Sequence, residues 1–462
     1  MKTNARLDGL CLLLLGCIVF LSLGPVLASS SPVAMGDFRE LYYPAHCLLQ
    51  HGDPYQYSEV LRVEKAEGLD RTWDIENTSN FEFERLIYPP SVFLIIVPMA
   101  MLPWGPAHIL WMVFILAGLV LAAFLMWNLA ADYAPVVAGS LIGMLVASSE
   151  LLMVFGNMAG IAISLCVVAS WCFLRNRFAL AGVLCLAISL AVKPQDAGLV
   201  WLCFFLAGGV YRKRAWQTLC LTVALSLPWL IWVWHVAPHW ISEQRASMVV
   251  LSDPGNINDP ALAAKGVHGL GLLISLQTVF SAFRDDPHFY NPASYLICGL
   301  LLLAWAWLTV QLGHGRPWLR PDLSGQDLPS QDRPSQQRLW LALATVSALS
   351  MLPVYHRQND AKLLLLAVPA CAILWAQGGK IGRLALFVTT AAIFLSGDLP
   401  GAIMLILAGR VSPASLSGRI LTGVQVFSIP IALLGAGIFY LWIFARQMDG
   451  RRGSVQAHSQ MP

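Results

Sequence analysis

Apolar runs long enough to cross a lipid bilayer recur along almost the whole sequence, and they restrict the possible folds more than any other feature. A helix needs about 20 mostly apolar residues to cross about 30 Å of hydrocarbon. The chain is 57% hydrophobic and only 12% charged, whereas a soluble domain carries about 25% charged residues. Since backbone polar groups in lipid must be satisfied within the chain, the sequence predicts an all-α, polytopic transmembrane helical bundle.

Charges, glycines and prolines divide these runs into about twelve predicted spans. The spans cover residues 10–28, 106–127, 135–155, 157–174, 178–193, 196–211, 215–236, 293–313, 338–355, 361–376, 383–398 and 421–445. A further run, YPPSVFLIIVPMAMLP at 88–103, is short and flanked by prolines. It is either a full span or a helix that dips into the membrane from one face. We expect one transmembrane domain over 1–451 and a disordered tail over 452–462.

The N-terminus combines a basic start, an apolar middle and a small-residue end. This pattern is typical of a signal peptide cleaved after Ala28, and also of an uncleaved first helix. We favour the uncleaved helix because Asp37 follows so closely. On either alternative the next loop is exported.

The basic patches of the sequence all fall on one side of the predicted bundle if the 88–103 run dips. These patches are Lys2 and Arg6, Arg175 and Arg177, Arg212 to Arg214, Arg316 to Arg338, Lys380 and Arg383, and Arg446 with Arg451 and Arg452. Because short cytoplasmic loops are enriched in basic residues, we predict that both termini are cytoplasmic in a multi-pass plasma membrane protein. The exported loops are then 29–87 and 237–292, and 314–338 is a cytoplasmic linker rich in Pro, Ser and Gln.

Several function classes are excluded or disfavoured by composition. The net charge of +3 is too small to indicate a nucleic-acid partner. All cysteines except Cys47 lie in apolar runs, so no disulfide framework is predicted. His46 and His51, with Asp37 and Asp53, match no metal-site spacing, and we expect neither a metal nor a cofactor.

The stretch GDFRELYYPAH at 36–46 places a carboxylate and two tyrosines after the first predicted span. On a helix starting here, Asp37 shares a face with Leu41 and Tyr42. A carboxylate at the membrane rim is suited to taking a proton from a hydroxyl nucleophile. It is equally suited to capping that helix, so residue type leaves both alternatives open.

Lys193 and the loop YHRQNDAK at 355–362 supply candidate phosphate ligands. Lys193 could hold a donor phosphate or extend to lipid headgroups, and Asp196 could neutralise it. Arg357 offers a bidentate clamp and His356 a second donor, which Asp360 could orient. The alternative is a solvated loop.

Two further segments are candidates for contact with substrate. Tyr88, before a proline pair, is either a cleft residue or an ordinary interfacial aromatic residue. The stretch DPGNINDP at 253–260, His268 and the following amphipathic run form either a lid over a lipid substrate or a surface helix.

Four stretches of the sequence resemble successive blocks of glycosyltransferase family 87. They are DFRELYYPAHCLLQHGDPY (37–55), YPPSVFLIIVPMAMLP (88–103), the block from GNMAG to LAVKP (156–194) and LPVYHRQNDAKLLLLAVPA (352–370). Their order and spacing match over roughly residues 10–375. The family resembles C-type mannosyltransferases that use polyprenol-phosphate mannose.

This resemblance implies a membrane hexosyltransferase, with mannose favoured, that uses a polyprenyl-phosphate sugar at the exported face. Asp37 matches the acidic position after the first helix and would be the general base. The implied substrate-binding residues are Tyr42, Tyr43, Tyr88, Asn157, Lys193, His356, Arg357 and Asp360. Gly156-Asn157 departs from the Gly-Gln-x-Asn type of sequence expected there. The partners would be the lipid-linked donor, a glycan, glycolipid or protein acceptor, and the bilayer.

Two other classes of protein share this layout. A secondary transporter would place ionisable residues near the bilayer midplane, often in two related halves. A non-catalytic assembly protein for envelope polysaccharide would not need the Asp37 carboxylate.

The predicted topology can be tested with reporter fusions. A reporter fused at Asp74 should be active only in the exported compartment, and one at Ser330 only in the cytoplasm. The reverse pattern would contradict the assignment of the basic loops.

Overall fold

The computed structural model describes residues 2–30, 34–68, 85–256, 258–262, 273–314, 333–408, 410–412 and 414–459. These residues form helices joined by short turns, with an isolated bridge between Leu273 and Arg357 in place of any named strand. Among them, 7 helices are long and apolar enough to cross a membrane. The prediction of an all-α polytopic membrane protein is confirmed.

Helices coincide with all of the predicted spans. Those that are long enough to cross are α1 (Lys2–Ser30), α6 (Trp104–Ala130), α7 (Pro135–Ala147) with α8 (Glu150–Phe155), α12 (Gly209–Val236), α15 (Pro287–His314), the 3₁₀ helix η3 (Gln358–Ala367) with α17 (Val368–Gln377), and α20 (Leu416–Ser459). The others are α9 (Ala159–Leu174), α10 (Ala179–Val192), α11 (Pro194–Ala207), α16 (Arg333–Leu349) and α18 (Gly379–Leu395).

Shorter helices occupy the loops that the sequence assigns to one face. The 88–103 run contains η1 (Pro90–Val92) and α5 (Phe93–Ala100), which together are too short for a full span. The two long loops contain α2 (Gly36–Leu49), α3 (Tyr57–Ala66), α13 (Trp240–Ser252) and α14 (Leu276–Ser281). Another short helix, α19 (Asp398–Ala408), follows α18 in the chain. The last helix, α20, includes residues 452–459, for which the sequence predicts a disordered tail.

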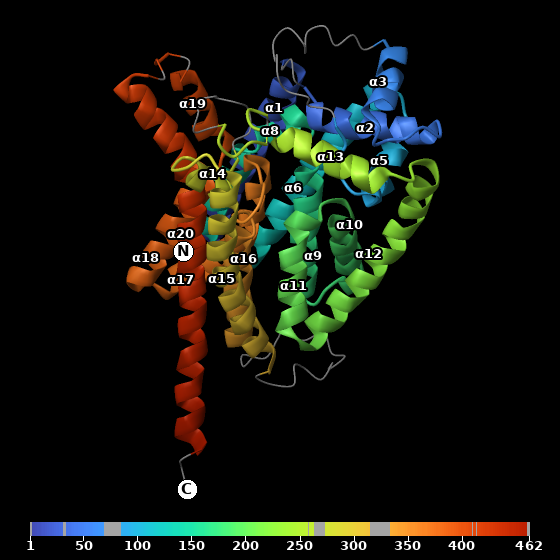
Figure 1. Cartoon of the computed structure of the whole chain (residues 1–462). Helices are drawn as coiled ribbons and strands as arrows, with labels where there is room; N and C mark the ends of the chain where they lie inside the picture. The colour runs from blue at the N-terminus through green and yellow to red at the C-terminus, as the bar shows by residue number, and fades with distance from the viewer. Residues whose placement is uncertain are drawn as a thin grey trace.

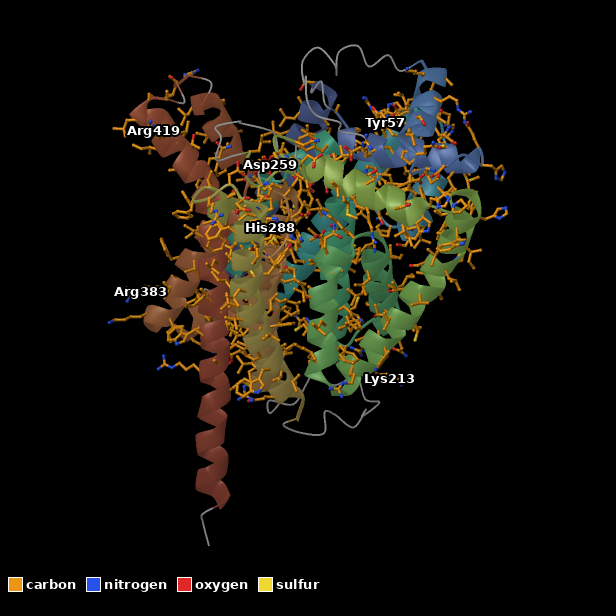
Figure 2. The ribbon with its side chains drawn as sticks, in the orientation of Figure 1. Tyr57, Lys213, Asp259, His288, Arg383 and Arg419 are labelled. Atoms are coloured by element: carbon orange, nitrogen blue, oxygen red, sulfur yellow. The ribbon has the colours of Figure 1, made fainter. Side chains whose placement is uncertain are left out.

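Figure 1 shows α2, α3, α13 and α19 gathered at one end of the bundle, which we call the loop end. In Figure 2, Tyr57 and Asp259 lie near this end and Lys213 lies near the opposite end. Tyr57 and Asp259, from the loops assigned to the exported face, therefore lie far from Lys213, which belongs to a basic loop. Arg383 lies between the two ends in this view.

Glycines let α1 and α7 approach until their backbones touch. A methyl group at Gly139 would lie 2.0 Å from the Gly9 carbonyl oxygen, and one at Gly16 would lie 2.2 Å from the Gly143 carbonyl oxygen. Close contact between small residues is a main source of helix association in lipid, where hydrophobic burial contributes little. Since α1 leads into α2 and α7 leads into α8, this contact positions the helix that carries Asp37 and the helix that precedes Asn157.

A buried ion pair closes the break between α7 and α8. Lys362 Nζ donates to the Ser148 carbonyl at 2.6 Å and lies 3.3 Å from Asp398 Oδ1. Asp398 Oδ2 accepts the Leu151 N–H at 2.7 Å. The pair therefore satisfies a carbonyl at the end of α7 and an N–H at the start of α8, which would otherwise be costly in a nonpolar interior.

The glycine contact leads to a stability prediction. Gly139→Ala should lower the thermal unfolding midpoint in detergent, because the added methyl group must push α1 away at a cost of about 1–3 kcal/mol. Gly299→Ala in α15 is the matched control, since nothing lies within 4 Å of its added methyl group. Equal midpoints for the two variants would contradict the close packing of α1 on α7.

Candidate active site

Asp37 lies in the first turn of α2 at the loop end. The N-cap residue is Met35, with a φ of 59°, and its N–H donates to the Val154 carbonyl at 2.6 Å. The start of α2 is therefore attached to α8. The described cap has no side-chain hydrogen bond, so the Asp37 carboxylate does not serve as the cap. It instead accepts a hydrogen bond from Asn157 Nδ2.

Asn157 is oriented through both atoms of its amide. Gly156 ends α8 with a left-handed φ of 64°, a conformation that favours glycine, and its carbonyl accepts Trp111 Nε1–H at 2.8 Å. Asn157 Oδ1 accepts the Ala159 N–H at 2.8 Å at the start of α9. Because the amide oxygen is bound in this way, its Nδ2 donor is directed to Asp37.

Burial and charge act on the Asp37 carboxyl in opposite directions. Burial is the largest effect and raises its pKa. The Arg357 charge, the Asn157 hydrogen bond and the Lys193 charge lower the pKa, while the Asp360 charge raises it again. The pKa of Asp37 stays above its ordinary value of 3.8. A carboxylate with a raised pKa is a stronger base than an exposed one.

Arg357 is held by side chains from two segments. Its Nε donates to Tyr355 Oη at 2.6 Å, and its Nη2 donates to Asn258 Oδ1 at 3.0 Å. Burial lowers the pKa of Arg357, but the Tyr355 and Asp37 groups more than offset this and raise it. The guanidinium therefore stays cationic, with its fork fixed between two elements.

Four buried side chains next to Arg357 form what we call the inner group: Lys193, Asp196, His356 and Asp360. Lys193 Nζ contacts Asp360 Oδ1 and lies 3.2 Å from Asp196 Oδ2. His356 Nε2 lies 3.6 Å from Asp196 Oδ1. The second oxygen of Asp360, Oδ2, accepts the Arg357 N–H at 3.0 Å. The inner group therefore joins the α10–α11 corner to the start of η3.

The charges of the inner group compensate one another. Burial lowers the pKa of His356, but its interaction with Asp196 and Asp360 outweighs burial and raises it. Burial likewise lowers the pKa of Lys193, and the two carboxylates raise it well above its ordinary value. The Lys193 ammonium thus faces the carboxylates of Asp196 and Asp360, and His356 lies beside Asp196, all on buried side chains.

Tyr42 and Tyr43 lie in an aromatic cluster between α2 and α6. Both side chains are buried, and their ring centroids lie 5.2 Å and 5.9 Å from that of Trp104. Tyr42 Oη also donates to the Leu102 carbonyl at 2.7 Å. These contacts hold α2 on α6, and a substrate contact for either tyrosine stays a prediction.

Tyr88 is half-buried beside the charged residues of the site. Its carbonyl accepts Tyr55 Oη–H at 2.8 Å. Burial raises the pKa of Tyr88, and the Lys193 charge only partly counters this. The phenol therefore stays protonated and able to donate a hydrogen bond.

The predicted site residues thus form two groups that differ in burial. Asp37, Tyr88 and Arg357 are half-buried, whereas Lys193, His356 and Asp360 are fully buried. Asn157 is also buried and serves Asp37. The structure brings Asp37, Arg357 and Lys193 close enough for their charges to interact.

Two residues of this arrangement were not among the predicted site residues. The sequence predicts for Asp196 only that it neutralises Lys193; its contact with His356 joins residues far apart in sequence. Asn258 lies in the DPGNINDP stretch, whose Asp259 accepts the Gly255 and Ala261 N–H groups at 2.8 Å each. The many turn-forming residues in this stretch are the sequence feature that indicates an ordered turn here.

The residues considered as metal ligands at the start of the chain have other partners. His46 Nδ1 lies 3.2 Å from Glu67 Oε1, and Asp53 Oδ1 accepts the Tyr55 N–H at 2.9 Å. Within the described part of the chain, the group with metal-like geometry is Asp196, His356 and Asp360, whose ligand atoms lie within 4.8 Å of one another.

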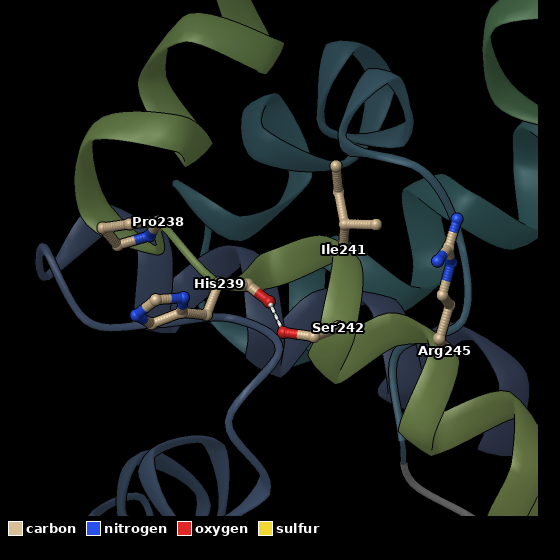
Figure 3. A pocket seen from close by; sticks show the side chains of 5 residues that line it. All are labelled: Pro238, His239, Ile241, Ser242 and Arg245. Atoms are coloured by element: carbon tan, nitrogen blue, oxygen red, sulfur yellow. Dashed lines mark hydrogen bonds between the residues drawn. The ribbon is translucent and has the colours of Figure 1, made fainter.

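An open pocket of 360 Å³ lies at the α12–α13 corner. Figure 3 shows Pro238, His239, Ile241 and Arg245 around it, with Ser242 Oγ donating to the His239 carbonyl at 2.7 Å. The pocket is lined by none of the predicted site residues.

The family model described as Glycosyltransferase family 87 matches residues 86–283. This range includes Tyr88, Asn157 and Lys193. Comparisons with curated proteins and with solved structures gave no match. The family match supports the resemblance seen in the sequence blocks: residues 86–283, which include the blocks at 88–103 and 156–194, are similar to glycosyltransferase family 87.

Proposed function

We propose that this protein is a glycosyltransferase that moves a hexose, with mannose favoured, from a polyprenyl-phosphate donor to an acceptor hydroxyl. The acceptor is a glycan, a glycolipid or a protein. The reaction takes place at the loop end, which we place on the exported face of the plasma membrane, with both termini in the cytoplasm. The assignment of the face follows from the basic loop that contains Lys213, which lies near the opposite end.

One observation supports this proposal above the others. The Asp37 carboxylate, oriented by Asn157, lies within the electrostatic influence of Arg357 and Lys193. Transfer from a sugar phosphate needs a base for the incoming hydroxyl and a cation for the departing phosphate. Asp37 supplies the base and Arg357 supplies a cation, and both side chains are half-buried rather than fully buried.

The reaction follows from this arrangement in a single displacement. Asp37 accepts the proton of the acceptor hydroxyl as the acceptor oxygen bonds to the anomeric carbon. The bond from that carbon to the phosphate oxygen breaks through an oxocarbenium-like state, and the electron pair leaves with the polyprenyl phosphate. The Arg357 fork meets the added negative charge on the phosphate.

Lys193 and Arg357 differ in burial, and we therefore assign them different roles. Lys193 is 5% exposed and contacts two carboxylates, whereas Arg357 is half-buried. We therefore assign direct phosphate contact to Arg357. The sequence predicts that Lys193 contacts the same phosphate. Within this proposal, Lys193 instead adds positive charge from its place in the inner group. His356 and Asp360 then hold the loop that carries Arg357.

The Asp37 role leads to the first activity prediction. Asp37→Asn should reduce sugar transfer by at least about 100-fold, because an amide cannot accept the hydroxyl proton. The measurement is transfer of labelled sugar from polyprenyl-phosphate mannose by the purified protein in detergent. The control is Asp132→Asn, which changes an exposed carboxylate 2.9 Å from Arg175 Nη2 and should leave transfer unchanged.

Asp37→Asn and the product formed together distinguish a glycosyltransferase from an assembly protein and from a transporter. A non-catalytic assembly protein would keep its activity in cells when Asp37 becomes Asn. A transporter would move substrate without forming a new glycosidic bond. Full transfer activity in folded Asp37→Asn protein would contradict the assignment of Asp37 as the general base.

A second prediction concerns the donor. Arg357→Lys keeps the charge but loses the planar fork and its hydrogen bonds to Tyr355 and Asn258, so KM for the lipid-linked donor should rise about tenfold or more. Arg245→Lys, on the exposed pocket at α13, is the matched control. An unchanged donor KM in Arg357→Lys would mean that the fork does not contact the phosphate.

A further inference from the structure

Three side chains of the inner group have the composition and placement of a metal-binding site. The ligand atoms of Asp196, His356 and Asp360 lie within 4.8 Å of one another, and all three residues are buried. His356 Nδ1 faces the Val354 carbonyl at 3.2 Å. This is the contact that commonly orients a histidine so that its Nε2 faces a metal.

The cation that these residues hold is an ammonium group. Lys193 Nζ contacts Asp360 Oδ1 and lies 3.2 Å from Asp196 Oδ2. Two buried carboxylates need a compensating cation, because an unpaired buried charge is strongly destabilising. A divalent ion bound to the same oxygens would lie against the ammonium, and their repulsion in a buried setting would be large.

We propose that Lys193 is the resident cation of a three-ligand site, and that Asp196, His356 and Asp360 bind one divalent transition-metal ion once this ammonium is removed. Imidazole and carboxylate ligands suit Zn²⁺, Co²⁺ and Mn²⁺. In the natural chain the lysine keeps such ions out. This inference concerns ion binding alone and does not depend on the proposed sugar transfer.

A second buried lysine provides a comparison within the same chain. Lys362 Nζ contacts the Ser148 carbonyl and lies 3.3 Å from the carboxylate of Asp398. Its group is not among the three-ligand groups of the described residues. Removing this lysine should therefore leave a buried polar gap without creating a metal site.

The test is Co²⁺ binding to the full-length protein in detergent. Lys193→Ala should bind one Co²⁺ per chain, with the visible absorption of a low-coordinate cobalt site. Wild-type protein and Lys362→Ala should bind none at the same concentrations. Adding His356→Ala to Lys193→Ala should weaken binding by at least about tenfold, since one ligand is then lost.

Three outcomes would overturn the proposal. The first is folded Lys193→Ala protein that binds no Co²⁺. The second is wild-type protein that binds Co²⁺ as tightly as the variant, because Lys193 would then not be the occupying cation. The third is Lys193→Ala protein that aggregates equally with and without Co²⁺ during purification, since a bound ion should replace the lost charge.

Discussion

The Lys193 ammonium, shared by Asp196 and Asp360, is the interaction on which the candidate site most depends. It joins the α10–α11 corner to the start of η3, and Asp360 in turn accepts the backbone N–H of Arg357. In a nonpolar interior such charges must be matched, because each unpaired one costs several kcal/mol. The position of Arg357 at the loop end thus follows from a charge balance among buried side chains.

A different contact holds the other half of the site. The glycines that bring α1 against α7 determine where α2 begins and where α8 ends. The Met35 N–H then joins α2 to the Val154 carbonyl, and Asn157 turns its amide to Asp37. Backbone contact on one side and ion pairing on the other bring a carboxylate and a guanidinium to the same end of the bundle.

Much of this architecture could be predicted because the bilayer constrains each segment separately. Every predicted span overlaps a helix, although 7 helices of the described residues are long and apolar enough to cross a membrane. The 88–103 run forms η1 and α5, which together are too short for a full span. The candidate charges Asp37, Lys193 and Arg357 stand out in the sequence against apolar surroundings, and their roles stay predictions. The contacts of Asp196 with His356 and of Asn258 with Arg357 were not found, because they join segments far apart in the chain.

Composition and hydropathy by themselves determined that this chain is a helical membrane protein, and the ordered blocks indicated its resemblance to glycosyltransferase family 87. Those properties are local, since each helix satisfies its own backbone in lipid and each block is read along the chain. Only the tertiary structure decided that Asp37 is bound by Asn157 rather than capping α2, and that Lys193 lies between two carboxylates. Such pairings depend on which buried surfaces meet, and one sequence read along its length does not contain that information.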